Sequence, residues 1–168
     1  GFAEQSTTIL DCQNTGMVTG AETSSEEIGG IAGECRGVLK QCESAPGLSL
    51  DFSRLEDLLS QELTGYYVGG IVGRLTGSME ECSTTGGYVL GNDHVGGIAG
   101  IVDWDEGGVL EANGSSNQAD VIANHCAGGI VGENQEGYTL KGWKNTGLVV
   151  VRGIQADVFP NGCAGGIA

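Results

Sequence analysis

The triplet Gly-Gly-Ile recurs five times along the chain, and this repetition constrains the fold more than any other feature. The copies begin at Gly29, Gly69, Gly96, Gly128 and Gly165, so consecutive copies lie 40, 27, 32 and 37 residues apart. Adjacent glycines weaken a strand or a helix by roughly 0.5–1 kcal/mol each relative to alanine, so the surroundings of each copy must compensate. A recurrence at such a period is typical of a stacked repeat architecture.

A second pattern lies upstream of each triplet. An apolar residue is followed three positions later by a marker residue, in the pairs Ile9 and Cys12, Leu39 and Cys42, Met79 and Cys82, Leu110 and Asn113, and Leu140 and Trp143. A turn-forming residue stands four positions beyond each marker, at Gly16, Pro46, Gly86, Asn117 and Gly147. A further glycine follows four of the triplets, at Gly33, Gly73, Gly100 and Gly132. Short β-leaning runs separated by turns therefore fill each unit.

A unit of about 30 residues cannot bury its apolar face alone, whereas stacked units share one core. The sequence therefore predicts an all-β fold, a β-solenoid of about five coils. We expect a right-handed parallel β-helix, because parallel crossover connections are usually right-handed. Residues 1–168 are predicted to form a single domain, with repeats at about 7–37, 38–77, 78–108, 109–137 and 138–168. In such a stack the isoleucines of the five triplets should form one column.

One segment, "DFSRLEDLLSQELTG", has a helical period and predicts a short helical insertion over residues 53–64. Ser53 and Glu56 match a capping box, and Gly65 is a suitable C-terminal stop. The residues that would share one helical face are Leu55, Leu58, Leu59 and Leu63. This apolar stripe would either pack on the flank of the stack or bind a partner.

The repeats resemble a known family. "VGGIVG" at Val68, "VGGIAG" at Val95, "AGGIVG" at Ala127 and the upstream "DCQNTGMVTG" are similar to the GLUG repeat of bacterial surface proteins. The resemblance spans residues 7–168, although the marker cysteine is replaced by Asn113 and then by Trp143, and the second copy carries an insertion. GLUG repeats occur in immunoglobulin-A-cleaving metallopeptidases and in adhesin-like proteins.

The resemblance implies a non-catalytic structural or adhesive module of a secreted or cell-surface bacterial protein. Such a module would act as a spacer or as a protein- or glycan-binding scaffold. Its expected partners are a host or cell-surface protein or glycan and the neighbouring domains of the same chain. Because Ala168 falls inside the last repeat, we expect the chain to be part of a longer protein.

Catalytic motifs are missing from the sequence. The two histidines, His94 and His125, stand in different repeats and form no H-E-x-x-H motif, so we interpret both as bystanders. No G-x-S-x-G elbow and no phosphate-binding loop is present. We therefore predict that the chain is not an enzyme and has no catalytic residues and no cofactor.

The alternative is a carbohydrate-active β-helix, lyase-like or hydrolase-like, because such enzymes place carboxylates on stacked coils. The candidate carboxylates follow Gly-Gly-Ile triplets and are Asp103, Asp105, Glu106, Glu133 and Glu136. Clustered acids and aromatics would favour this alternative, whereas Trp104 and Trp143 on different faces would favour the binding module. Basic partners are scarce, since Lys and Arg total 7.

Metal binding has one candidate in the sequence. "DWDEGG" faintly resembles a calcium loop through Asp103, Asp105 and Glu106, but it lacks the full set of ligand positions. We leave calcium binding there open and predict no metal site.

The acidity of the chain excludes some partners. Asp and Glu total 22, so the net charge is −15, which repels phosphate backbones and anionic lipids. No run of 18 apolar residues is present, so we expect no membrane insertion.

The six cysteines fall into registers. Cys12, Cys42 and Cys82 are markers, Cys126 and Cys163 each stand two residues before a Gly-Gly pair, and Cys35 stands alone. Parallel side chains in one ladder are poorly directed for disulfide formation. We therefore expect free and mostly buried thiols.

Overall fold

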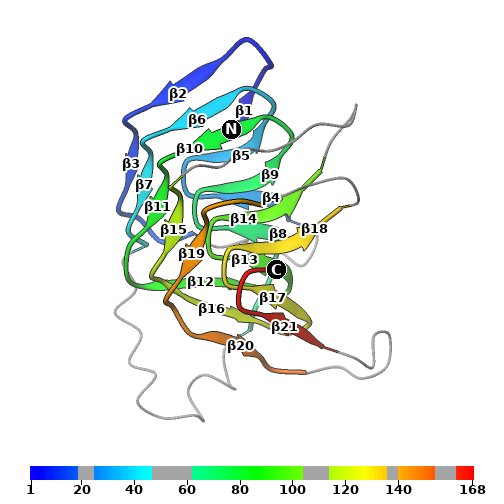
Figure 1. Ribbon diagram of the computed structural model, residues 1–168. Coiled ribbons are helices and arrows are strands. Elements are labelled where there is room, and N and C mark those ends of the chain that lie inside the picture. The colour runs from blue at the N-terminus through cyan, green and yellow to red at the C-terminus, as the bar shows by residue number, and fades with distance from the viewer. Residues whose placement is uncertain (19–24, 47–61, 104–113, 136–139, 154–161) are drawn as a thin grey trace.

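The computed structural model describes residues 1–18, 25–46, 62–103, 114–135, 140–153 and 162–168 (Figure 1). These residues form strands and no helix, which confirms the all-β prediction for the described part of the chain. None of the described residues belongs to a helix that could cross a membrane. Every strand pairing among them is parallel.

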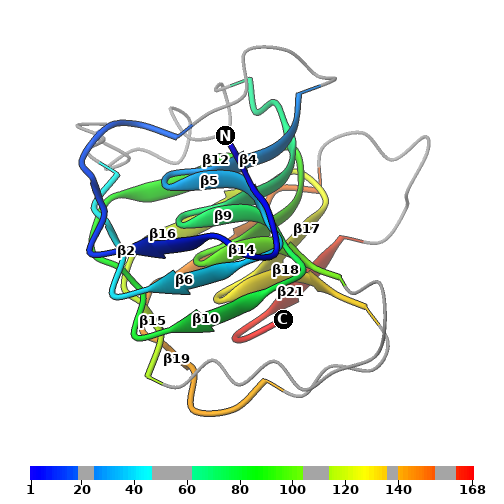
Figure 2. The same ribbon diagram turned by 90° about the horizontal axis from the view of Figure 1, so that it is seen from above.

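The strands form five parallel sheets, in which hydrogen-bonded neighbours come from successive repeats. Sheet 1 contains, in order, β1 (Phe2–Ala3), β5 (Ala32–Cys35), β9 (Val72–Leu75), β14 (Ala99–Val102) and β18 (Val131–Asn134). Sheet 2 contains β2 (Thr8–Leu10), β6 (Val38–Lys40) and β10 (Ser78–Glu80). Sheets 1 and 2 lie side by side in Figure 2.

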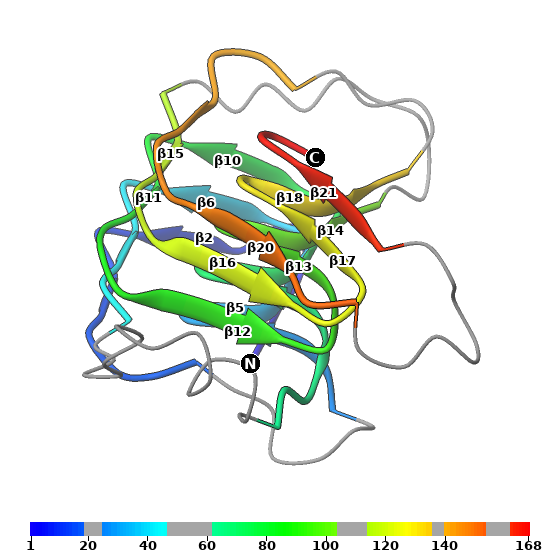
Figure 3. The same cartoon turned by 90° about the horizontal axis from the view of Figure 1, so that it is seen from below.

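The other three sheets complete the circuit of the chain. Sheet 3 contains β3 (Gln13–Asn14), β7 (Glu43–Ser44), β11 (Ser83–Thr84), β15 (Ser116–Asn117) and β19 (Lys144–Asn145). Sheet 4 contains β12 (Tyr88–Gly91), β16 (Asp120–Ala123) and β20 (Val149–Val151). Sheet 5 contains β4 (Glu26–Gly29), β8 (Tyr66–Gly69), β13 (Asp93–Gly96), β17 (Cys126–Gly128) and β21 (Cys163–Gly165). Figure 3 shows sheets 4 and 5 from below.

The isoleucines of the Gly-Gly-Ile triplets form the predicted column. The backbone N–H of Ile31 donates to the carbonyl oxygen of Ile71 at 2.9 Å, and Ile71 donates to Ile98 at 3.0 Å. Ile98 donates to Ile130 at 2.9 Å, and Ile130 donates to Ile167 at 3.0 Å. The side chains of Ile71, Ile98 and Ile130 are fully buried. The prediction of one vertical isoleucine column is therefore confirmed.

Close backbone packing explains the glycines around each isoleucine. The triplet turns the chain from sheet 5 into sheet 1, and a Cβ added to Gly96 would overlap the carbonyl oxygen of Ala99. A Cβ added to Gly132, one of the recurrent third glycines, would overlap the backbone of His94 in sheet 5. Sheets 1 and 5 thus pack backbone against backbone, and the buried isoleucine column and the ladder hydrogen bonds offset the entropic cost of glycine.

Two main groups of buried side chains fill the interior. The first lies among sheets 1, 2 and 3 and includes Leu39, Met79, Cys42 and Cys82, with Trp143 packed against it. The second lies between sheets 4 and 5 and is centred on the valines Val68, Val89, Val95 and Val121. Strand alternation places these valines inward, so their sequence neighbours face outward.

The corner between sheets 2 and 3 corrects one register of the sequence alignment. Each turn there passes through a residue with positive φ, at Asp11, Gln41, Glu81, Gly114 and Gly142. Ser115 follows Gly114, and its hydroxyl accepts a hydrogen bond from the Cys82 N–H at 3.2 Å. Ser115, rather than Asn113, therefore continues the marker register, and Asn113 itself lies outside the described residues. Trp143 keeps its predicted register, because Lys144 pairs with Ser116.

A polar column in sheet 3 was not predicted. Its members are Asn14, Ser44, Thr84, Asn117 and Asn145, of which the three central residues are buried and the two end residues are half-buried. The Thr84 hydroxyl donates to the Gly97 carbonyl at 2.7 Å, and the Asn117 amide donates to Asn145 Oδ1 at 2.9 Å. A Cβ on Gly97 would overlap the Asn117 amide, so this column also accounts for the second glycine of the triplet.

The predicted helix at 53–64 lies outside the described residues except for residues 62–64, which are not helical. Of its leucine stripe, only Leu63 can be placed. Leu63 is buried against Leu90 and Ile122, which project from sheet 4. The other three leucines, Leu55, Leu58 and Leu59, lie outside the described residues, so the packing of the stripe as a whole stays a prediction.

Candidate functional site

Sheet 5 presents a column of functional side chains on its outer surface. The residues two positions before each Gly-Gly pair are Glu27, Tyr67, His94, Cys126 and Cys163, here called the outward column. Their backbones run in register because the following residues pair directly, as in Val68 with Val95 and Val95 with Ala127. Since Val68 and Val95 are buried, strand alternation directs the outward column away from the core.

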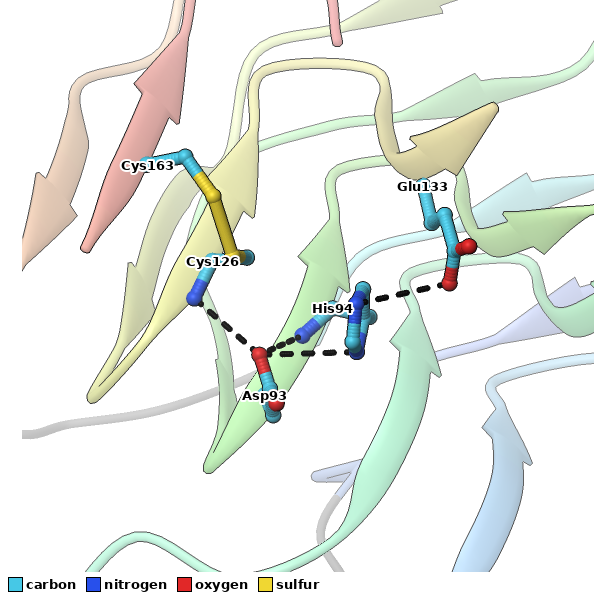
Figure 4. Close-up of a disulfide and its surroundings, with 5 residues drawn as sticks. All are labelled: Asp93, His94, Cys126, Glu133 and Cys163. Atoms are coloured by element: carbon cyan, nitrogen blue, oxygen red, sulfur yellow. Dashed lines mark hydrogen bonds and ion pairs between the residues drawn. A yellow bond between two sulfur atoms is a disulfide. The ribbon is translucent and has the colours of Figure 1, made fainter. Parts of the chain in front are cut away.

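His94 is the middle member of this column in sequence order, and Figure 4 shows it beside Asp93, Glu133 and the Cys126 strand. Its Nδ1 lies 3.4 Å from Asp93 Oδ1, and its Nε2 lies 3.4 Å from Glu133 Oε2. Its ring is tilted against that of Tyr67, with 5.4 Å between the ring centroids. The Nδ1 atom is buried and makes no hydrogen bond among the described residues. The imidazole is therefore held between two carboxylates and an aromatic ring.

Asp93 is a buried carboxylate, with only 5% of its surface exposed. Its Oδ1 accepts hydrogen bonds from the backbone N–H of His94 at 2.9 Å and from that of Cys126 at 3.2 Å. These two donors come from neighbouring strands, β13 and β17, so the carboxylate joins the strands beside the outward column.

Cys126 and Cys163 form a disulfide between β17 and the edge strand β21. This finding corrects the expectation that all six thiols are free. The Cα atoms are 4.6 Å apart, within the range that a disulfide spans. Parallel side chains on one face of a sheet are close enough to form a disulfide when their strands are direct neighbours. The prediction of free thiols considered the direction of the side chains and not this proximity.

The other four cysteines are free thiols. Cys35, Cys42 and Cys82 are buried, as expected, whereas Cys12 is partly exposed. Burial raises the pKa of the Cys82 thiol to about 12, and burial also raises the pKa values of Cys35 and Cys42. These groups are therefore neutral thiols near pH 7 and poor nucleophiles.

The candidate acids are only partly brought together. Asp103 Oδ2 lies 3.9 Å from Arg74 Nη1, while Arg74 Nε lies 3.1 Å from Glu27 Oε1. Arg74 also stacks over the Tyr67 ring, 5.8 Å from its centroid. The pKa of Tyr67 is raised, first by burial and then by the nearby charge of Glu133. A charged and aromatic patch therefore spans sheets 5 and 1.

The remaining sequence candidates lie elsewhere. Four of them lie outside the described residues: Asp105, Glu106, Glu136 and Trp104. The calcium-loop candidate and the comparison of the faces of Trp104 and Trp143 therefore stay untested. Trp143 packs against the first core group, and its indole N–H is buried. The backbone N–H of His125 donates to the carbonyl oxygen of Asn92 at 3.1 Å, and its carbonyl oxygen accepts from the N–H of Cys163 at 3.0 Å.

Sequence reasoning missed His94, although a signal was present. His94 stands two residues before Gly96-Gly97, the same position that Cys126 and Cys163 occupy before their own glycine pairs. In a stack of parallel strands, a shared position means spatial contact between neighbouring repeats. Aligning His94 by its position before the glycine pair, instead of searching for a linear catalytic motif, would have placed it beside Cys126.

The ligand atoms of Asp93, His94 and Cys126 all lie within 4.8 Å of one another. A carboxylate, an imidazole and a sulfur atom thus meet at one point on the surface of sheet 5. Comparison with protein-family models, with curated proteins and with solved structures finds no match for this chain.

Proposed function

We propose that the chain is a β-solenoid segment, a right-handed parallel β-helix of about five coils with GLUG-like repeats. The observation that carries this proposal is the order of the sheets. Consecutive strands pass from sheet to sheet, and strands within a sheet pair in parallel with equivalent strands of neighbouring repeats. Among the described residues, five strands stack in this way in each of sheets 1, 3 and 5, and three in each of sheets 2 and 4. Right-handedness rests on the general preference of parallel crossovers.

As to its role, this solenoid acts as a non-catalytic structural or adhesive scaffold of an extracellular bacterial protein. Five coils at the inter-strand distance span only about 24 Å, so the stack is a compact block that offers its outer columns to a partner. The Arg74, Tyr67 and Glu133 patch is suited to a protein or glycan surface, since aromatic and Arg side chains are enriched at binding interfaces. The charge of −15 supports a partner other than nucleic acid.

The disulfide supports secretion or surface exposure. Disulfides persist in oxidising compartments and are rare in the reducing cytosol. The Cys126–Cys163 bond lies on the outer surface of sheet 5, with Cys163 exposed, so cytosolic reductants would reach it.

The test is retention of the purified protein on immobilised surface glycans and extracellular proteins. We expect retention by the wild type and by Lys144→Ser, a control on the opposite sheet 3, and weak retention by the double variant Tyr67→Ser with Arg74→Ser. Absence of retention on every surface would overturn the adhesive role. Retention unchanged in the double variant would place the binding surface elsewhere.

A carbohydrate-active enzyme is the second candidate. The observation that favours it is the proximity of acids and aromatics, with Glu133 beside His94 and Asp103 beside Arg74. Polysaccharide cleavage that disappears in Glu133→Gln but persists in Glu34→Gln, another partly buried acid of sheet 1, would establish this candidate. Cleavage products would at the same time refute the non-catalytic scaffold.

A further inference from the structure

We propose that the outward column contains a redox-gated divalent metal site. When the Cys126–Cys163 disulfide is reduced, Asp93, His94 and Cys126 bind Zn²⁺, with Cys163 as the fourth ligand. When the disulfide is formed, the site is closed. Neither the scaffold role nor the enzyme alternative is needed for this proposal.

The donor set fits zinc. Zn²⁺ binds imidazole nitrogen, carboxylate oxygen and thiolate sulfur, commonly in tetrahedral geometry with four ligands. Bonds of about 2.0–2.3 Å hold the ligand atoms about 3.3–3.8 Å apart. The three ligand atoms lie within 4.8 Å of one another, so closure around an ion requires movements of about 1 Å. Cys163 adds a second sulfur because it is bonded to Cys126 in the oxidised state.

The histidine is already oriented for metal binding. Nδ1 is buried, makes no hydrogen bond among the described residues, and faces Asp93 (Figure 4). Nε2 faces the Glu133 carboxylate at 3.4 Å. A carboxylate on the far nitrogen of a ligating histidine holds the proton there and leaves the near nitrogen free for the metal. Glu133 thus occupies the position of an outer-shell partner.

Asp93 is fixed from behind. Two backbone N–H groups bind its Oδ1, one from β13 and one from β17. The carboxylate therefore keeps its place between the strands whether or not a metal is bound. Binding of a dication also reduces the repulsion among the acidic side chains of a chain with a net charge of −15.

The disulfide and the metal exclude each other because both use the sulfur of Cys126. Reduction by a dithiol or a phosphine breaks the S–S bond, delivers two electrons to the sulfurs and oxidises the reductant. Two protons complete the thiols, and metal binding displaces them as the thiolates form. Either state links β17 to the edge strand β21, through the S–S bond or through the ion, so the edge strand is held in both.

The experiment measures Zn²⁺ binding by competition with a chromophoric chelator, and Co²⁺ binding by its thiolate charge-transfer absorption. The protein is used in the oxidised form and after phosphine reduction. We expect one Zn²⁺ per reduced chain and none per oxidised chain. Equal binding by the two forms, or absence of binding by the reduced form, would overturn the proposal.

Variants locate the site and separate it from the four other thiols. His94→Asn suits a residue with φ of +50° and should weaken Zn²⁺ binding at least about tenfold, as should Asp93→Asn. Glu133→Gln should weaken it by about tenfold through the outer shell. His125→Asn is the matched control and should bind as the wild type does. Wild-type affinity in His94→Asn, with its fold intact by circular dichroism, would refute the site.

Discussion

Two columns of cysteines occupy equivalent positions in neighbouring repeats, yet they differ in chemistry. Cys126 and Cys163 are direct neighbours in sheet 5 and form a disulfide. The inward column, Cys12, Cys42 and Cys82, also stacks one residue above the next, but its members are free thiols. Register alone therefore brings sulfur atoms together in both columns, and it does not decide whether they bond.

The two columns differ in burial. In the inward column, Cys42 and Cys82 are buried in the core and the partly exposed Cys12 packs against it, and Cys42 Sγ lies 3.4 Å from Lys40 O. Burial raises the pKa of Cys82 to about 12, so the thiolate needed for disulfide formation is scarce. The outward column is open to solvent at Cys163, where oxidants and thiolates have access. Stacked cysteines therefore form a disulfide on the outer face of sheet 5, whereas those of the inward column pack as free thiols against the core.

The largest effect is expected from a charge placed in the inward column. Cys82→Asp puts a carboxylate among Leu39, Met79 and Cys42 without a partner, and should cost about 3–5 kcal/mol in the free energy of unfolding. Tyr67→Asp, in the outward column, should change stability by only about 1 kcal/mol. Urea unfolding measures both variants. Similar losses in the two would mean that the columns do not differ in burial.

Removal of the disulfide should have the next largest effect. Cys126 and Cys163 are 37 residues apart, and the double variant Cys126→Ser with Cys163→Ser should lose about 2–4 kcal/mol. Phosphine reduction should lower the melting temperature of the wild type and leave that of the double variant unchanged. A wild type indifferent to reduction would show that the bond does not stabilise the fold.

Alkaline pH should distinguish the inward column from an ordinary set of thiols. The folded-state pKa of Cys82, about 12, lies above the reference value of 9.0, so only the unfolded state loses this proton between those values. Stability contributed by the neutral thiol is complete below pH 9 and falls as pH rises toward 12, by up to about 1.4 kcal/mol per pH unit.

The measurement compares unfolding free energies at several pH values for Cys82→Ala and its parent, both carrying Cys126→Ser and Cys163→Ser to prevent disulfide exchange. Titrating groups that do not contact Cys82 contribute equally to both proteins. The difference in pH slope therefore reports Cys82 together with its effect on the pKa of the neighbouring Cys42 thiol. Parallel curves would mean that the Cys82 thiol titrates as it does in the unfolded chain.

The smallest effect concerns the corner that precedes each inward residue. Gly142 has φ of 71° and no atom closer than 3.8 Å to an added Cβ, so Gly142→Ala should cost only the strain of the left-handed conformation, about 1 kcal/mol. Gln41→Gly relieves that strain but loses the bond from Gln41 Nε2 to Glu81 Oε2 at 3.0 Å, and should be nearly neutral. Thermal unfolding compares the two, and a loss of several kcal/mol in Gly142→Ala would contradict the open corner.

Much of the fold could be predicted from the repeated apolar and glycine positions. The isoleucine column followed from the triplets because equivalent residues of parallel repeats lie next to one another. The fourth repeat was misaligned because the marker residue was expected three positions after an apolar residue, which pointed to Asn113. In the structure the marker residue follows the residue with positive φ at the corner, and in this repeat Gly114 is that residue and Ser115 is the marker.

The candidate site was harder to predict because it depends on which face a residue occupies. The sequence placed Cys126 and Cys163 in one register but gave no reason to expect that sulfurs on an open face would bond. The polar column was missed for the opposite reason. Asn117 was interpreted as a turn residue, whereas its amide is buried against Gly97 and bonded to Asn145. Buried polar side chains in a ladder satisfy one another, and linear motifs do not reveal this.

The glycine corner between sheets 5 and 1 has a consequence for how such chains change length. It fixes alignment at one point of each repeat, so the segments between corners are free to differ, as the spacings of 27 and 40 residues show. Closing the longer segment rather than the shorter costs less than about 1 kcal/mol of chain entropy. Insertions away from the corners therefore cost little free energy. Loops can be gained or lost during evolution, and a foreign peptide can be inserted by design, while the alignment of neighbouring repeats is preserved.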